Sequence, residues 1–213
     1  MPRRHIQHDA PLDQRLFEEA QRLRKEAKGT HPGIERERLI RKARQAETAA
    51  NMQRWLAAPH VAVWWNEPFD LASLEAKYGP RIDGSEPVYV YVIQFGGVPI
   101  GWIQWYRWRD FPEHAIRLGA DDRSAGIDLA IGEVEMTGRG LGPAAIREFG
   151  TNYIFSNGDV GAIVADPSAS NKRSVSAFRK AGFNIVDTVR LGGEAFERHV
   201  VRLDRNDSKI PPP

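Results

Sequence analysis

Two features of the sequence could do chemistry, and they lie about ten residues apart. The first is Asp128, a single carboxylate inside the apolar run Ile127-Asp128-Leu129-Ala130-Ile131. An ionised Asp in an apolar strand costs several kcal/mol unless it is paired, hydrogen-bonded or facing a cleft. Such a carboxylate can accept a proton and hold a cation, although a structural ion pair would also explain it. Asp128 is therefore the candidate catalytic residue.

The second feature is a glycine-rich turn that leads into an amphipathic helix, Thr137-Gly138-Arg139-Gly140-Leu141-Gly142-Pro143. Its three glycines let the backbone take positive φ and approach a ligand closely, so that successive N–H groups can converge on an anion. The helix expected over about residues 143–155 adds the positive end of its dipole. The turn predicts a phosphate cradle, and glycines that serve only the turn are the alternative.

The turn differs from both the dinucleotide fingerprint and the P-loop, but it resembles the pyrophosphate loop of GCN5-related N-acetyltransferases. Gly140-Leu141-Gly142 match the end of that loop. Thr137 stands where the family has Gln or Arg, and Arg139 could supply the cation instead. A second signature of the family is matched by three elements further along: Asn171, Phe178 and Gly182-Phe183.

Within this superfamily, residues 52–204 are most similar to aminoglycoside 6′-N-acetyltransferases. The motifs that carry the similarity are Trp64-Trp65, the run 99–106, Gly126-Ile127-Asp128 and Ile131-Gly132-Glu133. The resemblance implies an α/β fold with a central, mostly antiparallel sheet flanked by helices. It also implies acetyl-CoA as co-substrate and no metal. The activity implied is direct transfer of the acetyl group, in a ternary complex, to a primary amine of a polycationic small molecule such as an aminoglycoside, and hence antibiotic resistance.

The resemblance assigns residues to two adjoining sites. The cofactor site would comprise Ile131, Glu133, Thr137, Gly138, Arg139, Gly140, Leu141, Gly142, Pro143 and Asn171. The strand before the loop would pair its backbone with the pantetheine arm. The substrate site would comprise Trp65, Gln104, Tyr106, Asp128 and Asp166. Several have simpler explanations: Trp65 and Gln104 as core residues, Asn171 as a helix cap, and Asp166 as a turn residue before a proline.

Other functions stay open because the sequence departs from the family at some positions. Phe178 stands where many members have a Tyr that serves as general acid. Water, Tyr153 or another hydroxyl could replace it, or no acid is needed, since a thiol has a pKa of about 8.5. A siderophore-type lysine N-acyltransferase is an alternative, although such enzymes typically carry His in place of Asp128. A protein N-acetyltransferase and a non-catalytic acetyl-CoA-binding module are the others.

The composition is that of a globular chain that acts without thiol chemistry. Its 213 residues are 41% hydrophobic and 27% charged. The lack of cysteine excludes disulfides, thiolate metal sites and an acyl-cysteine intermediate. No apolar run approaches the length of a membrane span and the N-terminus does not read as a secretory signal. We therefore expect a cytoplasmic protein with no membrane partner.

The chain divides into three expected parts: a charged helical hairpin over residues 1–50, the acetyltransferase domain over residues 51–204, and a disordered tail over residues 205–213. Apolar stripes predict one helix over residues 11–28 and a second from Ile34 to Pro59. Residues 1–54 carry 13 Lys and Arg against 8 Asp and Glu. Such a hairpin could bind nucleic acid or a partner, but it more often serves as a solvated appendage or as the contact of a homodimer. Nucleic acid is not an expected partner, because no aromatic residues interleave the charges.

The elements that must position the sites are a β-hairpin, further strands and capped helices. Strands are predicted over residues 88–95 and 98–107, joined at Gly96-Gly97. On the second of them, Trp102, Gln104 and Tyr106 share one face. A loop is expected over residues 110–124, and capped helices over residues 71–78 and 172–181. Residues 1–50 contain no alternating segment for the strand that usually opens this fold.

Overall fold

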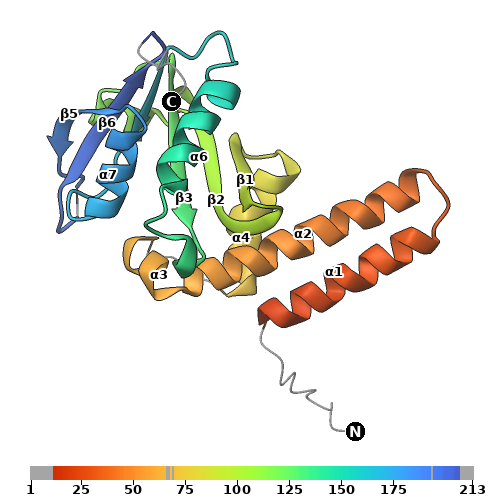
Figure 1. The fold of residues 1–213 in the computed structure, drawn as a ribbon. Helices are drawn as coiled ribbons and strands as arrows, with labels where there is room; N and C mark the ends of the chain where they lie inside the picture. The colour runs from red at the N-terminus through yellow and green to blue at the C-terminus, as the bar shows by residue number, and fades with distance from the viewer. Residues whose placement is uncertain (1–11, 66–67, 69, 193, 207–213) are drawn as a thin grey trace, which may run out of the picture.

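The computed structural model describes residues 12–65, 68, 70–192 and 194–206, and it is built on one mixed sheet (Figure 1). The strand order is β1-β2-β3-β4-β6-β5. Neighbouring strands are antiparallel except for β3 and β4, which are parallel. The bounds are β1 Val88–Phe95, β2 Val98–Arg107, β3 Ser124–Ile131, β4 Ala162–Ala165, β5 Asn184–Val189 and β6 Arg198–Asp204. The predicted α/β fold with a mostly antiparallel sheet is confirmed.

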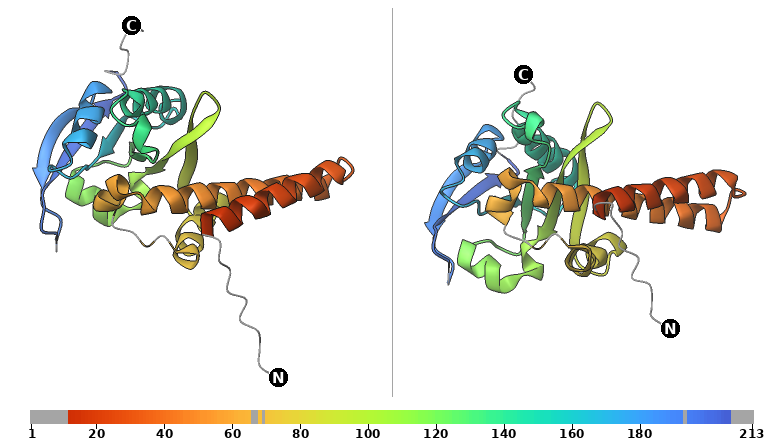
Figure 2. Two further views of the ribbon diagram at one scale, coloured as in Figure 1. Left: turned by 60° about the horizontal axis from the view of Figure 1, so that its bottom comes forward. Right: turned by 90° about the horizontal axis from the view of Figure 1, so that it is seen from below.

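Helices cover both faces of this sheet (Figures 1 and 2). One face packs against α6 and α7 through a core that includes Ile127, Ile146 and Phe178. The other packs against α2, α3 and α4 through Trp55, Leu74 and Trp102. The helices are α1 Leu12–Gly29, α2 Ile34–Ala57, α3 Pro59–Trp65, α4 Leu71–Asp83, α5 Pro112–Leu118, α6 Leu141–Phe149 and α7 Lys172–Lys180. None of the described helices is long and apolar enough to cross a bilayer.

The helical hairpin and the β-hairpin form where the sequence predicts them. Helices α1 and α2 pack through Leu23, Ala27, Leu39 and Ala43, and their joined ends project away from the sheet (Figures 1 and 2). The boundary expected after residue 50 falls inside α2, which continues to Ala57. On β2 the predicted alternation holds, because Trp102 packs under α2 to α4 while Ile103 packs under α6 and α7. Most of the expected tail, residues 207–213, lies outside the described residues.

Several predicted boundaries are wrong, and local sequence explains why. The expected loop over residues 110–124 contains α5, which has Pro112 in its first turn and ends at Gly119 with φ +64°. Helix α4 has the predicted Asp70 cap but runs through Pro80 to Asp83. Helix α6 begins at Leu141, and a π-helical turn over Gly150–Ile154 follows it.

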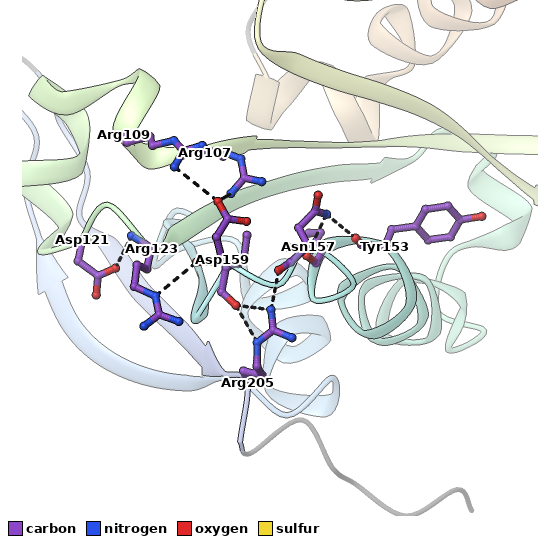
Figure 3. A network of polar contacts seen from close by, with 10 residues as sticks. Arg107, Arg109, Asp121, Arg123, Tyr153, Asn157, Asp159 and Arg205 are labelled. Carbon is purple, nitrogen blue, oxygen red and sulfur yellow. Dashed lines mark hydrogen bonds and ion pairs between the residues drawn. The ribbon is translucent and has the colours of Figure 1, made fainter.

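Strands β3 and β4 pair over only three residues each and then separate. The pairs run from Ser124 with Ala162 to Gly126 with Val164. Figure 3 shows the polar network that holds the paired end, where Asp159 accepts hydrogen bonds from Arg107 at 2.7 Å and from Arg109 at 3.5 Å. Arg205 donates to the Asn157 oxygen at 2.6 Å in the same network. The β3–β4 pair is therefore held together at the Ser124 end of β3, and the two strands are apart at the Ile131 end.

No strand among the described residues precedes β1, so the hairpin does not replace the missing edge strand with one of its own. Instead, α2 packs on the face of the sheet and reaches the end of β3. A Cβ built on Gly132 would lie 2.0 Å from the Trp55 ring. Trp55 Nε1 also donates to Glu133 Oε1 at 2.8 Å. The last turns of α2 therefore fix the backbone that follows β3.

We expect Gly132→Ala to destabilise the fold by about 1–3 kcal/mol, because the new methyl group must displace Trp55. Urea unfolding followed by tryptophan fluorescence measures the change. Gly161→Ala is the matched control, since a Cβ there would lie 3.8 Å from its nearest neighbour, the Arg123 side chain, which is an ordinary contact distance. Equal free energies of unfolding for the Gly132→Ala protein and the wild type would contradict the contact.

Candidate active site

The open end of the β3–β4 pair leads into a groove of about 960 Å³. Its walls come from α3, the second half of β3, the glycine-rich turn and α7. Of the predicted cofactor residues, Ile131, Thr137, Gly138, Gly140, Gly142, Pro143 and Asn171 line it, as does Trp65 from the predicted substrate set. Lys172, Arg173 and Lys180 also line it, so its α7 wall suits an anion.

The glycine-rich turn has the backbone that its sequence predicts. Gly138 has φ +72° and Gly140 has φ +79°, in the region that favours glycine. Gly140 is also the N-cap of α6, and a Cβ on it would meet no atom within 4 Å. The space above the turn is therefore free, and the N–H groups of the first turn of α6 can point into it.

One edge of β3 is exposed to this groove because β4 has separated from it. Gly132 N donates to Ile100 O on β2 at 2.8 Å. Backbone bonding alternates along an antiparallel pair, so the backbone groups of Leu129 and Ile131 face the opposite side. The Ile131 oxygen lies 3.0 Å from His60 Nε2. The backbone of Leu129 faces no strand within the described chain, so it is available to an extended ligand.

Three predicted cofactor residues do not line the groove. The Glu133 carboxylate accepts hydrogen bonds from Trp55 Nε1 and Arg54, so it secures α2 to the end of β3. Arg139 is exposed and its Nη1 lies 3.2 Å from Met136 Sδ. Leu141 is the first residue of α6. Thr137, which does line the groove, donates its hydroxyl hydrogen to Val134 O at 2.7 Å and so stabilises the turn.

Asp128 is partly buried and is held through Gln104 on the neighbouring strand. The two residues are register partners, and Gln104 Nε2 donates to Asp128 Oδ2 at 2.9 Å. Arg81 Nη1 in turn donates to Gln104 Oε1 at 3.1 Å. Gln104 is 5% exposed, so this chain gives a buried amide partners on both sides. The arginine reaches the carboxylate only through the amide.

Burial raises the pKa of Asp128 to about 6. The hydrogen bond from Gln104 opposes this rise, the charge of Asp166 adds to it, and the charge of Arg81 opposes it. Asp128 is therefore largely ionised at neutral pH yet readily protonated. This is the property expected of a general base.

Two other predicted substrate residues, Tyr106 and Asp166, lie near Asp128 in different environments. The Tyr106 ring lies against Gly126, where a Cβ would be 2.3 Å away, and burial followed by the charge of Asp128 raises its pKa well above 10. Asp166 is paired, since its Oδ2 lies 3.1 Å from His114 Nε2 and 3.4 Å from Arg198 Nη1. Asp166 is therefore a carboxylate that already has a cationic neighbour, Arg198, and a substrate amine would have to compete with it.

The aromatic residues near the site are mostly structural. Trp65 packs on Trp102 with ring centroids 5.3 Å apart, so it is both a core contact and part of the groove wall. Phe178 is buried and packs against Phe183. Tyr153 is half exposed, stacks on Phe149 and lies outside the groove lining, beside the network of Figure 3. Asn171 caps α7 by accepting from Ser174 N, as predicted.

Sequence reasoning missed three residues that shape the site. His60 meets the open edge of β3, Arg81 orients Gln104, and Arg198 pairs with Asp166. His60 and Ile131 are 71 residues apart, and Arg81 and Gln104 are 23 apart. No local spacing could have revealed these contacts, and Arg81 lies beyond the helix that the sequence predicts over residues 71–78. Among the described residues, no cluster of His, Asp and Glu is arranged to hold a metal ion.

The arrangement places a proton acceptor beside a groove whose lining includes Lys172, Arg173 and Lys180. Asp128 lies next to Leu129, which lines that groove. The carboxylate can accept a proton from a cation on the sheet face that it shares with Gln104. A backbone group on the open edge of β3 can hydrogen-bond a carbonyl oxygen. These parts are those required to transfer an acyl group to an amine.

Comparison with known proteins agrees with this geometry. Residues 45–191 match the family described as acetyltransferase (GNAT) domain. An aminoglycoside N(6′)-acetyltransferase type 1 from Klebsiella pneumoniae is 31% identical over 144 residues, which are 66% of this chain and 71% of that protein. The crystal structure of aminoglycoside acetyltransferase AAC(6′)-Ib with coenzyme A and kanamycin has a TM-score of 0.62 and 28% identity, over 75% of this chain and 90% of that one. A structure of AAC(6′)-Ib with acetyl-CoA has a TM-score of 0.61 and 27% identity, over 75% and 89%.

We expect Gln104→Leu to raise the pKa of Asp128 above its value of about 6, because burial is then no longer opposed by the amide hydrogen bond. Titration of the carboxyl carbon by NMR measures this pKa. Gln94→Leu, on the exposed part of β1, is the control and should leave it in place. If the pKa of Asp128 stays the same in the Gln104→Leu protein, the amide of Gln104 does not influence the ionisation of Asp128.

Proposed function

Because the chain belongs to the GNAT acetyltransferase family and is thus an N-acetyltransferase, we propose that it moves the acetyl group of acetyl-CoA to a primary amine of a polycationic small molecule such as an aminoglycoside. The observation that carries this proposal is Asp128, a partly buried carboxylate with a pKa of about 6 beside the open edge of β3. The named relatives act on or bind aminoglycosides, which supports the substrate class.

The groove has the chemistry that acetyl-CoA requires. Its positive-φ glycines and the first turn of α6 would hold the diphosphate, as the anion-binding property of helix N-termini suggests. Lys172, Arg173 and Lys180 would offset the phosphate charge. The exposed edge of β3 would bind the pantetheine amides by strand-like hydrogen bonds. When bound, acetyl-CoA supplies an activated acyl carbon and a thiol leaving group.

The residues around Asp128 would act on the acceptor amine. The Asp128 carboxylate takes a proton from the substrate ammonium, directly or through one water, so that the neutral amine can attack the acyl carbon. A C–N bond forms, the C–S bond breaks with its electron pair on sulfur, and the second proton lost by the nitrogen passes through water to the thiolate. An N–H on the open edge of β3 stabilises the carbonyl oxygen in the transition state. Since Phe178 cannot donate a proton, the leaving thiol, with a pKa of about 8.5, would depart with the help of water alone.

The site favours a cationic acceptor over neutral ones. Asp166 lies close enough to Asp128 for its charge to raise the pKa of Asp128. Glu194 pairs with Arg198, the same arginine that pairs with Asp166. An acceptor with several amines could approach Asp128 with one of them and Asp166 with another. A lysine N-acyltransferase, a protein N-acetyltransferase and a non-catalytic acetyl-CoA-binding protein remain the rival functions, and substrate screening separates them.

We expect Asp128→Asn to lower kcat/KM at least about a hundredfold, the scale of a lost general base. The test is a thiol-release assay with acetyl-CoA and a panel of aminoglycosides, polyamines and lysine derivatives. In the wild type, kcat/KM should rise with pH through about pH 6, because only ionised Asp128 accepts a proton, and the variant should lack this rise. Acetyl-CoA binding without turnover on any amine would favour the non-catalytic alternative.

We expect Gly140→Ala to raise the KM for acetyl-CoA by about tenfold or more, because an alanine at φ +79° distorts the turn that holds the diphosphate. Steady-state kinetics at saturating amine measure the effect. Gly97→Ala carries nearly the same backbone strain at φ +80° in the β1–β2 turn, which does not line the groove, and is the matched control. If both variants raise KM equally, the loss reflects general strain and the cradle assignment is wrong.

A further inference from the structure

The projecting end of the helical hairpin is a concentrated positive charge that the proposed reaction does not use. We define the arm tip as residues 22–44, which contain nine Lys and Arg and three Glu. The tip thus carries a net charge of +6, although the whole chain has only +2. The match to the acetyltransferase family begins at residue 45, so the tip lies outside it. We propose that the arm tip is a binding surface for the phosphate backbone of double-helical nucleic acid.

Many of these cations are available for a partner. Internal ion pairs occupy Arg22, Arg24 and Arg38. Five others are exposed and form no ion pair with any described acidic residue: Lys25, Lys28, Arg41, Lys42 and Arg44. Folding therefore leaves a cluster of solvated cations at one place. Nucleic-acid binding releases the counterions that such a cluster and the phosphates attract.

The tip is too far from the catalytic strand to serve the reaction by its charge. Trp55 is the residue of α2 that contacts the end of β3. At 1.5 Å per residue, Arg44 and Ile34 lie about 16 and 30 Å along α2 from it. Both distances exceed the Debye length of about 8 Å at physiological salt. A positive tip would in any case repel a cationic substrate, so its partner is a separate, anionic molecule.

The shape of the tip favours nucleic acid over a membrane or a protein. The apolar residues Leu23, Ala27, Leu39 and Ala43 are buried in the seam between the helices, and Ile34 is the one large apolar side chain exposed in the tip. A helix that binds in a membrane surface needs a broad apolar face, and protein interfaces have apolar centres depleted in Lys. A surface of Arg and Lys without an apolar centre fits phosphates, which position a protein without reading sequence. From the sequence we expected a solvated appendage or a dimer contact and no nucleic-acid partner; the exposed cations gathered at the tip, unpaired within the described chain, are the observation against that expectation.

The test is fluorescence anisotropy of a labelled duplex of about 20 base pairs, as DNA and as RNA, titrated with the full chain. We expect binding that weakens steeply between about 50 and about 200 mM NaCl. Combining Lys25→Gln, Arg41→Gln, Lys42→Gln and Arg44→Gln should weaken binding tenfold or more and reduce the salt slope by roughly 3 to 4, about one per lost phosphate contact. The rate of acetyl transfer to a small amine should not change in this variant.

The matched control removes four exposed cations outside the arm tip: Arg15→Gln, Arg117→Gln, Arg179→Gln and Arg190→Gln. This control lowers the net charge by the same four units as the tip variant, but it should keep most of the affinity for the duplex. The proposal is overturned if the wild type does not bind the duplex at about 50 mM NaCl, or if the control loses as much affinity as the tip variant. It is also overturned if polyglutamate or vesicles containing phosphatidylserine bind the tip as tightly as the duplex does. None of these results bears on the acetyltransferase activity, which the kinetic assay tests separately.

Discussion

The separation of β3 from β4 after three paired residues is the constraint on which the site depends. A parallel pair that continued to the end of β3 would use the backbone groups of Leu129 and Ile131 in ladder hydrogen bonds and would close the groove. The polar network around Asp159 and Arg205 fixes the paired end (Figure 3), so the strands diverge from a rigid base. The glycine-rich turn can then lie beside the exposed edge, so one groove holds both the open strand edge and the proposed diphosphate site.

The electrostatics of Asp128 follow from its place on the same strand. Burial and the charge of Asp166 raise the pKa of the carboxyl, whereas the hydrogen bond from Gln104 and the charge of Arg81 favour ionisation. The balance costs stability. Because the pKa in the fold is above that of an unfolded Asp, the fold loses free energy of unfolding as pH rises towards 6, by roughly 3 kcal/mol in all. A site that carries this cost and retains an ionisable group is typical of a functional residue.

Helix α2 connects two regions that have different roles. Its last turns place Trp55 against Gly132 and Glu133, so the helix that begins in the predicted appendage ends within the catalytic domain. Its first turns, with α1, carry the cations of the arm tip away from the sheet (Figure 2). The helix is continuous between these regions. It therefore holds a partner of the tip at a defined distance from the groove, too far for mutual electrostatic interference at physiological salt.

The sequence by itself determined the features that depend on local backbone chemistry. Gly138 and Gly140 shape the glycine-rich turn through their positive φ. Asp70 and Asn171 cap their helices. The alternation of side chains in the β-hairpin predicted which face of the sheet carries Gln104. The identity of Asp128 as the unusual carboxylate was also visible, because one charge in an apolar strand is a local anomaly. Tertiary structure alone decided what that charge contacts. The bonds from Gln104 and Arg81, the contact of His60 with Ile131, and the separation of β3 from β4 join residues far apart in the chain, and such pairings leave no periodic trace in a single sequence.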